Sequence, residues 1–193
     1  MRELSEYQSF RNCLGITKSV PRMKDVEIVL RFIAFYDQTY LNYNGRMKSF
    51  LNEFMSDRKN VAAEKCQNYR DAFRLACDLA WSVFGDKAFR RYTIGAVQNK
   101  NGMWETSINK ALFDAVMWVF TRYEKRQILP VKDAIRERLI ELMTIDQEFV
   151  ESVTLATADV PKVRLRFQRW LDEVGKIVIA KGSNQEYLAI GTS

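Results

Sequence analysis

Residue types that carry out catalysis are scarce in this chain. None of its 193 residues is a histidine, which excludes serine–histidine and cysteine–histidine catalysis, histidine-ligated metals and nucleases with a histidine base. The nearest match to the Asp-x-Lys element of metal-dependent nucleases is Asp57-Arg58-Lys59, which falls between two predicted helices. Neither Gly-x-Gly nor a Gly-Lys-Ser/Thr run occurs, so no phosphate loop is predicted. We therefore expect no catalytic residue, no metal and no cofactor.

Three cysteines, Cys13, Cys66 and Cys77, are the only thiols. They form no Cys-x-x-Cys pair, and an odd, sparse set argues against a zinc site or a disulfide framework. Cys66 and Cys77 fall in an apolar helical pattern, so we expect them to be small core residues. With no apolar leader segment in Met1–Phe10 and no membrane-length apolar run, the expected location is a reducing cytoplasm without membrane contact.

The clearest group of cations lies on the predicted last helix. Lys162, Arg166 and Arg169 recur at helical spacing on one face, with Arg164 offset from them. Guanidinium groups bind phosphate through two parallel hydrogen bonds, so this face is a candidate DNA-backbone contact. The alternative is that the preceding helix, which is rich in carboxylates, neutralises this face through ion pairs that are worth about 0–1 kcal/mol each.

Two further groups of cations are candidate nucleic-acid contacts. Arg22, Lys24, Arg46 and Lys48 lie near two predicted helix starts, and Lys87, Arg90 and Arg91 lie in a segment predicted to be irregular. In the second group cations alternate with aromatic residues, which suits base stacking and phosphate contact. The alternative is a solvated basic surface. The net charge of +6 is mild, so it permits an acidic partner without requiring one.

Five aromatic residues recur at helical spacing in the first third of the chain. They are Phe32, Phe35, Tyr36, Tyr40 and Tyr43. We interpret the cluster as packing between the first two major helices, because aromatic residues at this spacing are typical of a core. The alternative is an interface for a partner protein. In the same segment Glu27 precedes Arg31 by one helical turn, a spacing that favours an ion pair within the helix.

The elements that must position these residues are helices. Hydrophobic residues make up 47% of the chain, and only 3 prolines and 8 glycines interrupt it, which favours long helices. Helical apolar spacing covers residues 1–15, 21–41, 47–55, 60–84, 107–124, 130–151 and the segment from 159 onward. No strand alternation persists. The sequence therefore predicts an all-α fold, a compact bundle of six or seven helices with at most a minor strand near 177–180.

Breaks in the pattern separate these helices. Ser19–Pro21 separates the segment 1–15 from the segment 21–41, and a turn with Gly45 follows 21–41. Gly85 ends the segment 60–84. Residues 87–102 are predicted to be irregular, with Phe89 as an anchor. We expect a single helical domain over 1–182 and a loose C-terminal tail over 183–193.

Several stretches of the chain resemble a known family. Arg22–Phe35, RMKDVEIVLRFIAF, and Met47–Met55, MKSFLNEFM, look like the helical half of the GmrSD-type restriction proteins, which are prokaryotic anti-phage proteins with a ParB-related amino-terminal module. The opening Glu3–Gly15 and two later segments, Ile108–Ala115 (INKALFDA) and Val163–Phe167 (VRLRF), fit the same pattern in the same order.

The resemblance covers the helical part of such proteins and none of their catalytic motifs. The family's ParB-like module carries an Asp-Gly-Gln-Gln-Arg-type run for nucleotide handling, and many members end in a histidine-containing nuclease domain; neither feature occurs here. The resemblance implies a non-catalytic domain of a phage-defence system that binds DNA, a separate ParB-like subunit, or both. The alternatives are a protein-only structural or regulatory subunit and a truncated gene product.

Overall fold

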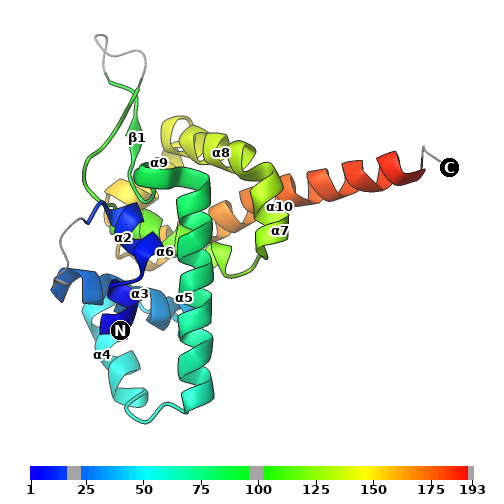
Figure 1. Ribbon diagram of the computed structural model, residues 1–193. Helices are drawn as coiled ribbons and strands as arrows, with labels where there is room; N and C mark the ends of the chain where they lie inside the picture. Colours follow the sequence, from blue (N-terminus) through cyan, green and yellow to red (C-terminus); the bar gives the residue numbers. More distant parts are fainter. Residues whose placement is uncertain (17–22, 96–101, 191–193) are drawn as a thin grey trace.

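The computed structural model describes residues 1–16, 23–95 and 102–190, with side chains described up to residue 182. Over these ranges the fold is all-α, as the sequence predicts, with one small antiparallel ribbon (Figure 1). The helices are α1 (Arg2–Ser5), α2 (Gln8–Leu14), α3 (Met23–Gln38), α4 (Met47–Asp57), α5 (Ala63–Phe84), α6 (Lys110–Phe120), α7 (Lys125–Ile128), α8 (Lys132–Thr144), α9 (Gln147–Thr154) and α10 (Val160–Ile190). Short 3-10 turns η1 (Tyr40–Asn42), η2 (Gly85–Lys87) and η3 (Leu129–Val131) and the strands β1 (Tyr92–Thr93) and β2 (Met103–Trp104) complete the described elements.

Helix α6 lies at the centre of the bundle. Every residue of α6 after Lys110 is buried, and the helix packs against α3, α5 and α10. The side chain of Asn109 caps its start by accepting a hydrogen bond from the Leu112 N–H at 3.0 Å, and its amide donates to the Val153 carbonyl at 2.7 Å. Two adjacent apolar stripes in this segment already favour a central position, because a helix that is apolar nearly all round must be covered on most sides.

The structure differs from the prediction at several boundaries, and the predicted helix over residues 1–15 is divided into α1 and α2. The segment 130–151, predicted as one helix, is divided into α8 and α9. The division falls at Asp146, whose carboxylate accepts a hydrogen bond from the Phe149 N–H at 3.0 Å and caps a new helix, a role that aspartate favours. At the other end, α10 passes through 177–180 as helix, so the minor strand considered there does not form.

Two short strands, β1 and β2, lie at the two ends of the segment predicted to be irregular. Tyr92 pairs with Trp104 and Thr93 with Met103 in an antiparallel ribbon. Phe89 is buried and packs its ring 4.9 Å from that of Phe113, which confirms its expected role as an anchor. Gly45 has φ 93°, as the predicted turn requires. The predicted break at Ser19–Pro21 lies outside the described residues.

Two helices extend away from the main body. Figure 1 shows α4 and the link to α5 at one end of the long α5 helix, and α10 running out of the bundle. The first turns of α10 bury Val163, Phe167 and Trp170 against the core, whereas Ile179 is 69% exposed. The helix continues beyond Gly182 to Ile190, where the sequence predicted a loose tail; residues 191–193 lie outside the described part of the chain.

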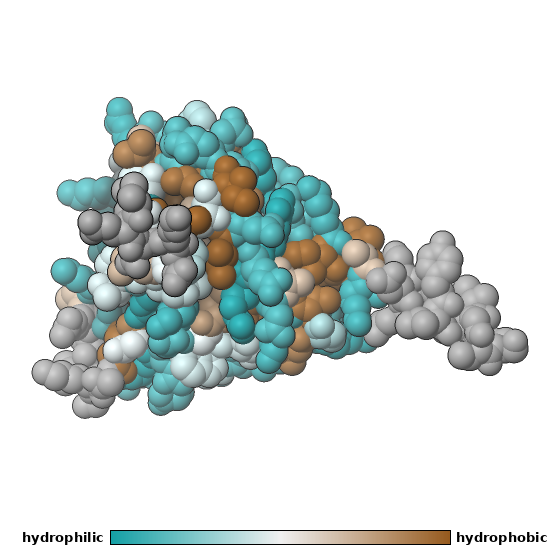
Figure 2. Space-filling model, turned by 90° about the horizontal axis from the view of Figure 1, so that it is seen from above, coloured by the Kyte–Doolittle hydropathy of each residue, from teal (hydrophilic) through white to brown (hydrophobic). Residues whose placement is uncertain are grey.

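The surface seen from above is mainly hydrophilic with separate apolar patches (Figure 2). Among the described residues, no helix is both long enough and apolar enough to cross a lipid bilayer.

Candidate functional site

Arg166, one of the predicted phosphate contacts, is fully buried. Its Nη1 donates to the carbonyls of Ser152 at 3.1 Å and Thr157 at 2.8 Å, and its Nη2 lies 3.8 Å from the Asp114 carboxylate. A buried guanidinium cannot reach a DNA backbone. The prediction of Arg166 as a nucleic-acid contact is therefore wrong, because its side chain faces α6 rather than solvent.

The other cations of the last helix are mostly neutralised. Lys162 pairs with Glu151 at 2.7 Å, and Arg169 pairs with Asp146 and with Glu148, the latter at 3.0 Å. These carboxylates belong to α9 and the turn before it, so the alternative interpretation, in which acidic neighbours satisfy this face, describes these two side chains. Arg164 is different: it is exposed, and its described hydrogen bond runs to the Leu41 carbonyl at 3.1 Å.

The two other groups of cations differ in their contacts. Lys87 pairs with Asp86 at 2.7 Å and Arg91 with Glu105 at 3.3 Å, and Arg90 donates to the Cys13 carbonyl at 2.8 Å. Those contacts occupy the predicted aromatic–cation segment with bonds inside the protein. Lys24, Arg46 and Lys48 are exposed at the starts of α3 and α4, and Arg22 lies outside the described residues.

The aromatic cluster is core. Phe32, Phe35, Tyr40 and Tyr43 are almost fully buried, and Tyr36 is half-buried. The ring of Phe35 lies 5.1 Å from Phe50 of α4 and 5.0 Å from Phe167 of α10. The buried four are therefore core residues and are not available as a partner interface. Contrary to the prediction, their packing is not confined to the first two major helices, because Phe32 lies 5.2 Å from Phe73 of α5 and Tyr40 lies 4.8 Å from Phe167 of α10.

Arg31 also differs from its predicted role. Its Nε donates to Asp114 at 3.1 Å, while Glu27 pairs instead with Lys110 at 2.7 Å. The sequence suggested a pair within one helix because spacing reveals only local neighbours. The observed pair joins α3 to α6.

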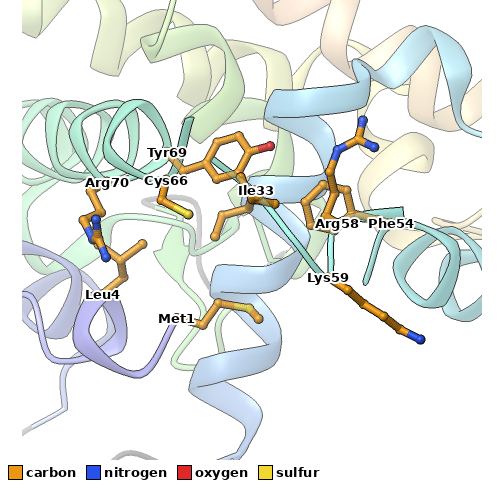
Figure 3. Close-up of a pocket in the computed structure, with 10 residues that line it drawn as sticks. Met1, Leu4, Ile33, Phe54, Arg58, Lys59, Cys66, Tyr69 and Arg70 are labelled. Carbon is orange, nitrogen blue, oxygen red and sulfur yellow. The ribbon is translucent and has the colours of Figure 1, made fainter. Parts of the chain in front are cut away.

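A hollow of the described surface lies where α1, α3, α4 and α5 meet. It has a volume of about 290 Å³ and is lined by Met1, Leu4, Ile33, Phe54, Arg58, Lys59, Val61, Cys66, Tyr69 and Arg70. Figure 3 shows Cys66 and Ile33 in its middle, with Arg70 on one side and Arg58 and Lys59 on the other. We call this feature the α4–α5 hollow. None of the ten lining residues is acidic.

Asp37 holds one side of the α4–α5 hollow together. Its carboxylate accepts from the Tyr69 hydroxyl at 2.8 Å and from Arg58 Nε at 3.0 Å, and it lies 2.5 Å from Lys65 Nζ. Burial alone would raise the pKa of Asp37, but hydrogen bonds from Lys65, Tyr69 and Arg58 outweigh it and lower that pKa. The side chains that reach Asp37 from α5 and the α4–α5 link are thereby fixed.

The opposite rim is held more loosely. Arg70 Nε lies 3.3 Å from Glu3, and Arg74 Nη2 lies 2.8 Å from the same carboxylate, whose side chain is 57% exposed. Lys59 is exposed, and no ion pair is recorded for it among the described residues. Exposed pairs are worth about 0–1 kcal/mol, so these cations can change partners at little cost. The α4–α5 hollow therefore combines an apolar floor with a positive rim, in which Arg70 and Lys59 are held more weakly than Arg58.

In the sequence, Arg58 and Lys59 stand out only as part of a weak Asp-x-Lys match, and no pattern identifies Asp37 or Tyr69 as site residues. The available signal was the pair of cations at the end of a short helix, directly before a long one. The hollow itself depends on contacts between α1 and α5, which are far apart in the chain.

No group of histidine, cysteine and carboxylate side chains suited to a metal ion occurs in the described ranges. No family model, curated protein or solved structure matches this chain.

Proposed function

We propose that this chain is a helical binding module that captures a partner protein through the α4–α5 hollow. The observation that carries the proposal is the combination of an apolar floor, which includes Leu4, Ile33 and Phe54, with a rim whose charged lining residues are all cations. The occupant that fits is an acidic segment that inserts one apolar side chain. The apolar contact supplies affinity, and complementary charge supplies specificity and association rate.

The resemblance to GmrSD-type proteins suggests who the partner is. We propose a separate ParB-like subunit of a phage-defence system in a prokaryotic cytoplasm, with the nucleotide chemistry performed by that subunit. The support is the sequence pattern described above and the absence of the family's catalytic motifs from the sequence.

Protein capture is preferred over DNA capture by the predicted last-helix face. Lys162 and Arg169 already have carboxylate partners, and Arg166 is buried, so that face offers a phosphate little free charge.

The test is co-purification with a ParB-like protein encoded by a neighbouring gene. The double variant Lys59→Glu/Arg70→Glu reverses two rim charges and is expected to weaken the complex at least about tenfold, because like charges then face the acidic segment. The control is Lys132→Glu, which reverses an exposed cation on α8. Equal binding by the rim variant and the control contradicts the assignment of the hollow, and failure of the unmodified chain to bind contradicts partner capture itself.

A second readout uses the thiol of Cys66, which lines the hollow. Occupation of the hollow is expected to slow modification of this thiol by a water-soluble disulfide reagent. If the complex forms and the rate of modification does not change, the partner binds elsewhere.

A further inference from the structure

Arg122 lies over an indole ring. It follows the end of α6, and the central carbon of its guanidinium lies 4.2 Å from the centre of the Trp118 ring. Trp118 is almost fully buried, while Arg122 is exposed. A guanidinium stacked in this way has one face covered, and its other face and its N–H edge point away from the ring.

Arg122 forms no ion pair with a carboxylate among the residues that the structure describes. Burial lowers the pKa of Arg122, the hydroxyls of Tyr36 and Tyr40 partly oppose that change, and no acidic residue contributes. Arg126, one helical turn further on, instead pairs with Glu124 at 2.7 Å. The charge of Arg122 is therefore partly desolvated and uncompensated, a condition that an anion from outside would relieve.

A second unpaired guanidinium approaches the same place from α10. Arg164 Nη2 donates to the carbonyl of Leu41 at 3.1 Å, and the neighbouring residue Tyr40 packs its ring 5.0 Å from that of Trp118, the indole that Arg122 covers. Burial and Asp172 raise the pKa of the Tyr40 hydroxyl, and both cations lower it. That hydroxyl donates to Gln168 at 2.8 Å. The nearby carboxylate, Asp172, accepts a hydrogen bond from the Gln168 amide at 2.8 Å. The surface thus carries two arginines and a polar amide around a buried aromatic base.

We propose that Arg122 and Arg164 form a binding site for a nucleoside phosphate, either as a free nucleotide or as part of a single strand. The N–H edges of the two guanidiniums bind the phosphate oxygens, and the free face of Arg122 stacks on the adjacent base. Stacking requires the planar cation that Trp118 holds in position. This site is independent of the α4–α5 hollow and of the proposed protein partner.

The experiment measures fluorescence anisotropy of a labelled single-stranded oligothymidylate at low salt, with inorganic phosphate, thymidine monophosphate and unlabelled strand as competitors. Arg122→Ala is expected to weaken strand binding about tenfold or more, because it removes a stacking face and a phosphate contact. Arg122→Lys keeps the charge and is expected to lose most of the same affinity, because an ammonium group does not stack. Arg126→Ala is the matched control and is expected to bind as the unmodified chain does.

The competitors distinguish the two sources of phosphate. If thymidine monophosphate displaces the labelled strand at a concentration similar to that of unlabelled strand, counted per nucleotide, the ligand is a free nucleotide. If only unlabelled strand displaces it, the ligand is a nucleic acid. Both results support the site. Inorganic phosphate that competes as well as the nucleotide contradicts stacking. Arg164→Ala provides a second variant at an exposed position in case Arg122→Ala unfolds the end of α6. Unchanged strand affinity in both alanine variants, or no binding of any probe, overturns the proposal.

Discussion

Arg166 and Asp114 face each other in the core, with Arg166 Nη2 3.8 Å from Asp114 Oδ2 and both side chains fully buried. The same carboxylate accepts a hydrogen bond from Arg31 Nε at 3.1 Å. The Asp114 carboxylate therefore compensates the charges of both Arg31 and Arg166, and these contacts connect α3, α6 and α10. Burial lowers the pKa of Arg166 to about 10, although Asp114 opposes that change. The Nε and Nη2 atoms of Arg166 have no hydrogen-bond acceptor among the described residues, so its charge is compensated by this carboxylate and by the carbonyls of Ser152 and Thr157 that accept from Nη1.

Asp114→Asn is expected to destabilise the protein by about 3–5 kcal/mol, because it leaves two buried guanidiniums without an anion. The measurement is urea unfolding followed by circular dichroism. Asp133→Asn is the control, since the Asp133 side chain is 70% exposed and its pair with Arg136 is a surface pair within α8. A loss for Asp114→Asn as small as that of the control would show that the buried cluster contributes little.

Phe35→Ala is expected to cost about 3–5 kcal/mol, because it opens a cavity where α3, α4 and α10 meet. Phe35→Leu keeps most of the volume and is expected to cost less than half as much. Thermal and urea unfolding measure both. A near-neutral Phe35→Ala variant would favour the partner-interface interpretation of the aromatic cluster over the packing interpretation.

The three thiols are expected to react at very different rates in the folded protein. Burial raises the pKa of Cys13 to about 12 and raises the pKa of Cys77 well above its ordinary value, so neither forms the reactive thiolate readily. Cys66 is half-buried and lines the α4–α5 hollow. A disulfide reagent should modify Cys66 first and the other two only in denaturant, which mass spectrometry of the modified peptides checks. Rapid modification of Cys13 or Cys77 without denaturant would contradict their burial.

The hydrogen bonds of Asp37 are expected to make the folded protein less stable in acid. The pKa of Asp37 is lower in the folded protein than the ordinary value of 3.8, so the stability that it contributes is fully present above that value and is lost as the pH falls through the lowered pKa. Asp37→Asn should be less stable than the unmodified chain at neutral pH, and the difference should shrink as the pH falls below 3.8 and through the lowered pKa of Asp37. Unfolding curves from pH 7 to pH 2 measure this difference. Asp71→Asn, at an exposed position on α5, controls for the substitution itself. A difference that stays constant over the whole range would contradict the role of Asp37.

The helices could be predicted from the sequence because their signal is local. Apolar spacing indicated the central α6, and Gly85 marked the end of α5. The division between α8 and α9 was missed because a single capping aspartate, Asp146, decides it within an otherwise continuous apolar pattern. The ribbon was missed because its paired strands have two residues each, too few to show alternation.

The sites were harder to predict because charge partners are set by tertiary contacts. Helical spacing placed Arg166 with Lys162 and Arg169, but it did not reveal that Asp114 lies opposite, 52 positions earlier in the chain. Arg122 carried no signal at all, since its defining properties are the indole beneath it and the lack of an ion pair with any described carboxylate.

Helix α4 packs mainly on α3 and borders two hollows, the α4–α5 hollow at Phe54 and a second one at Met47, Leu51 and Met55. A helix supported on one side opens at a lower free energy than the whole protein. Amide hydrogens of α4 are therefore expected to exchange with deuterium faster than those of α6, by a route that does not require global unfolding. A segment bound in either hollow would suppress this local opening of α4. Partner binding should therefore slow amide exchange in α4 at partner concentrations too low to raise the melting temperature.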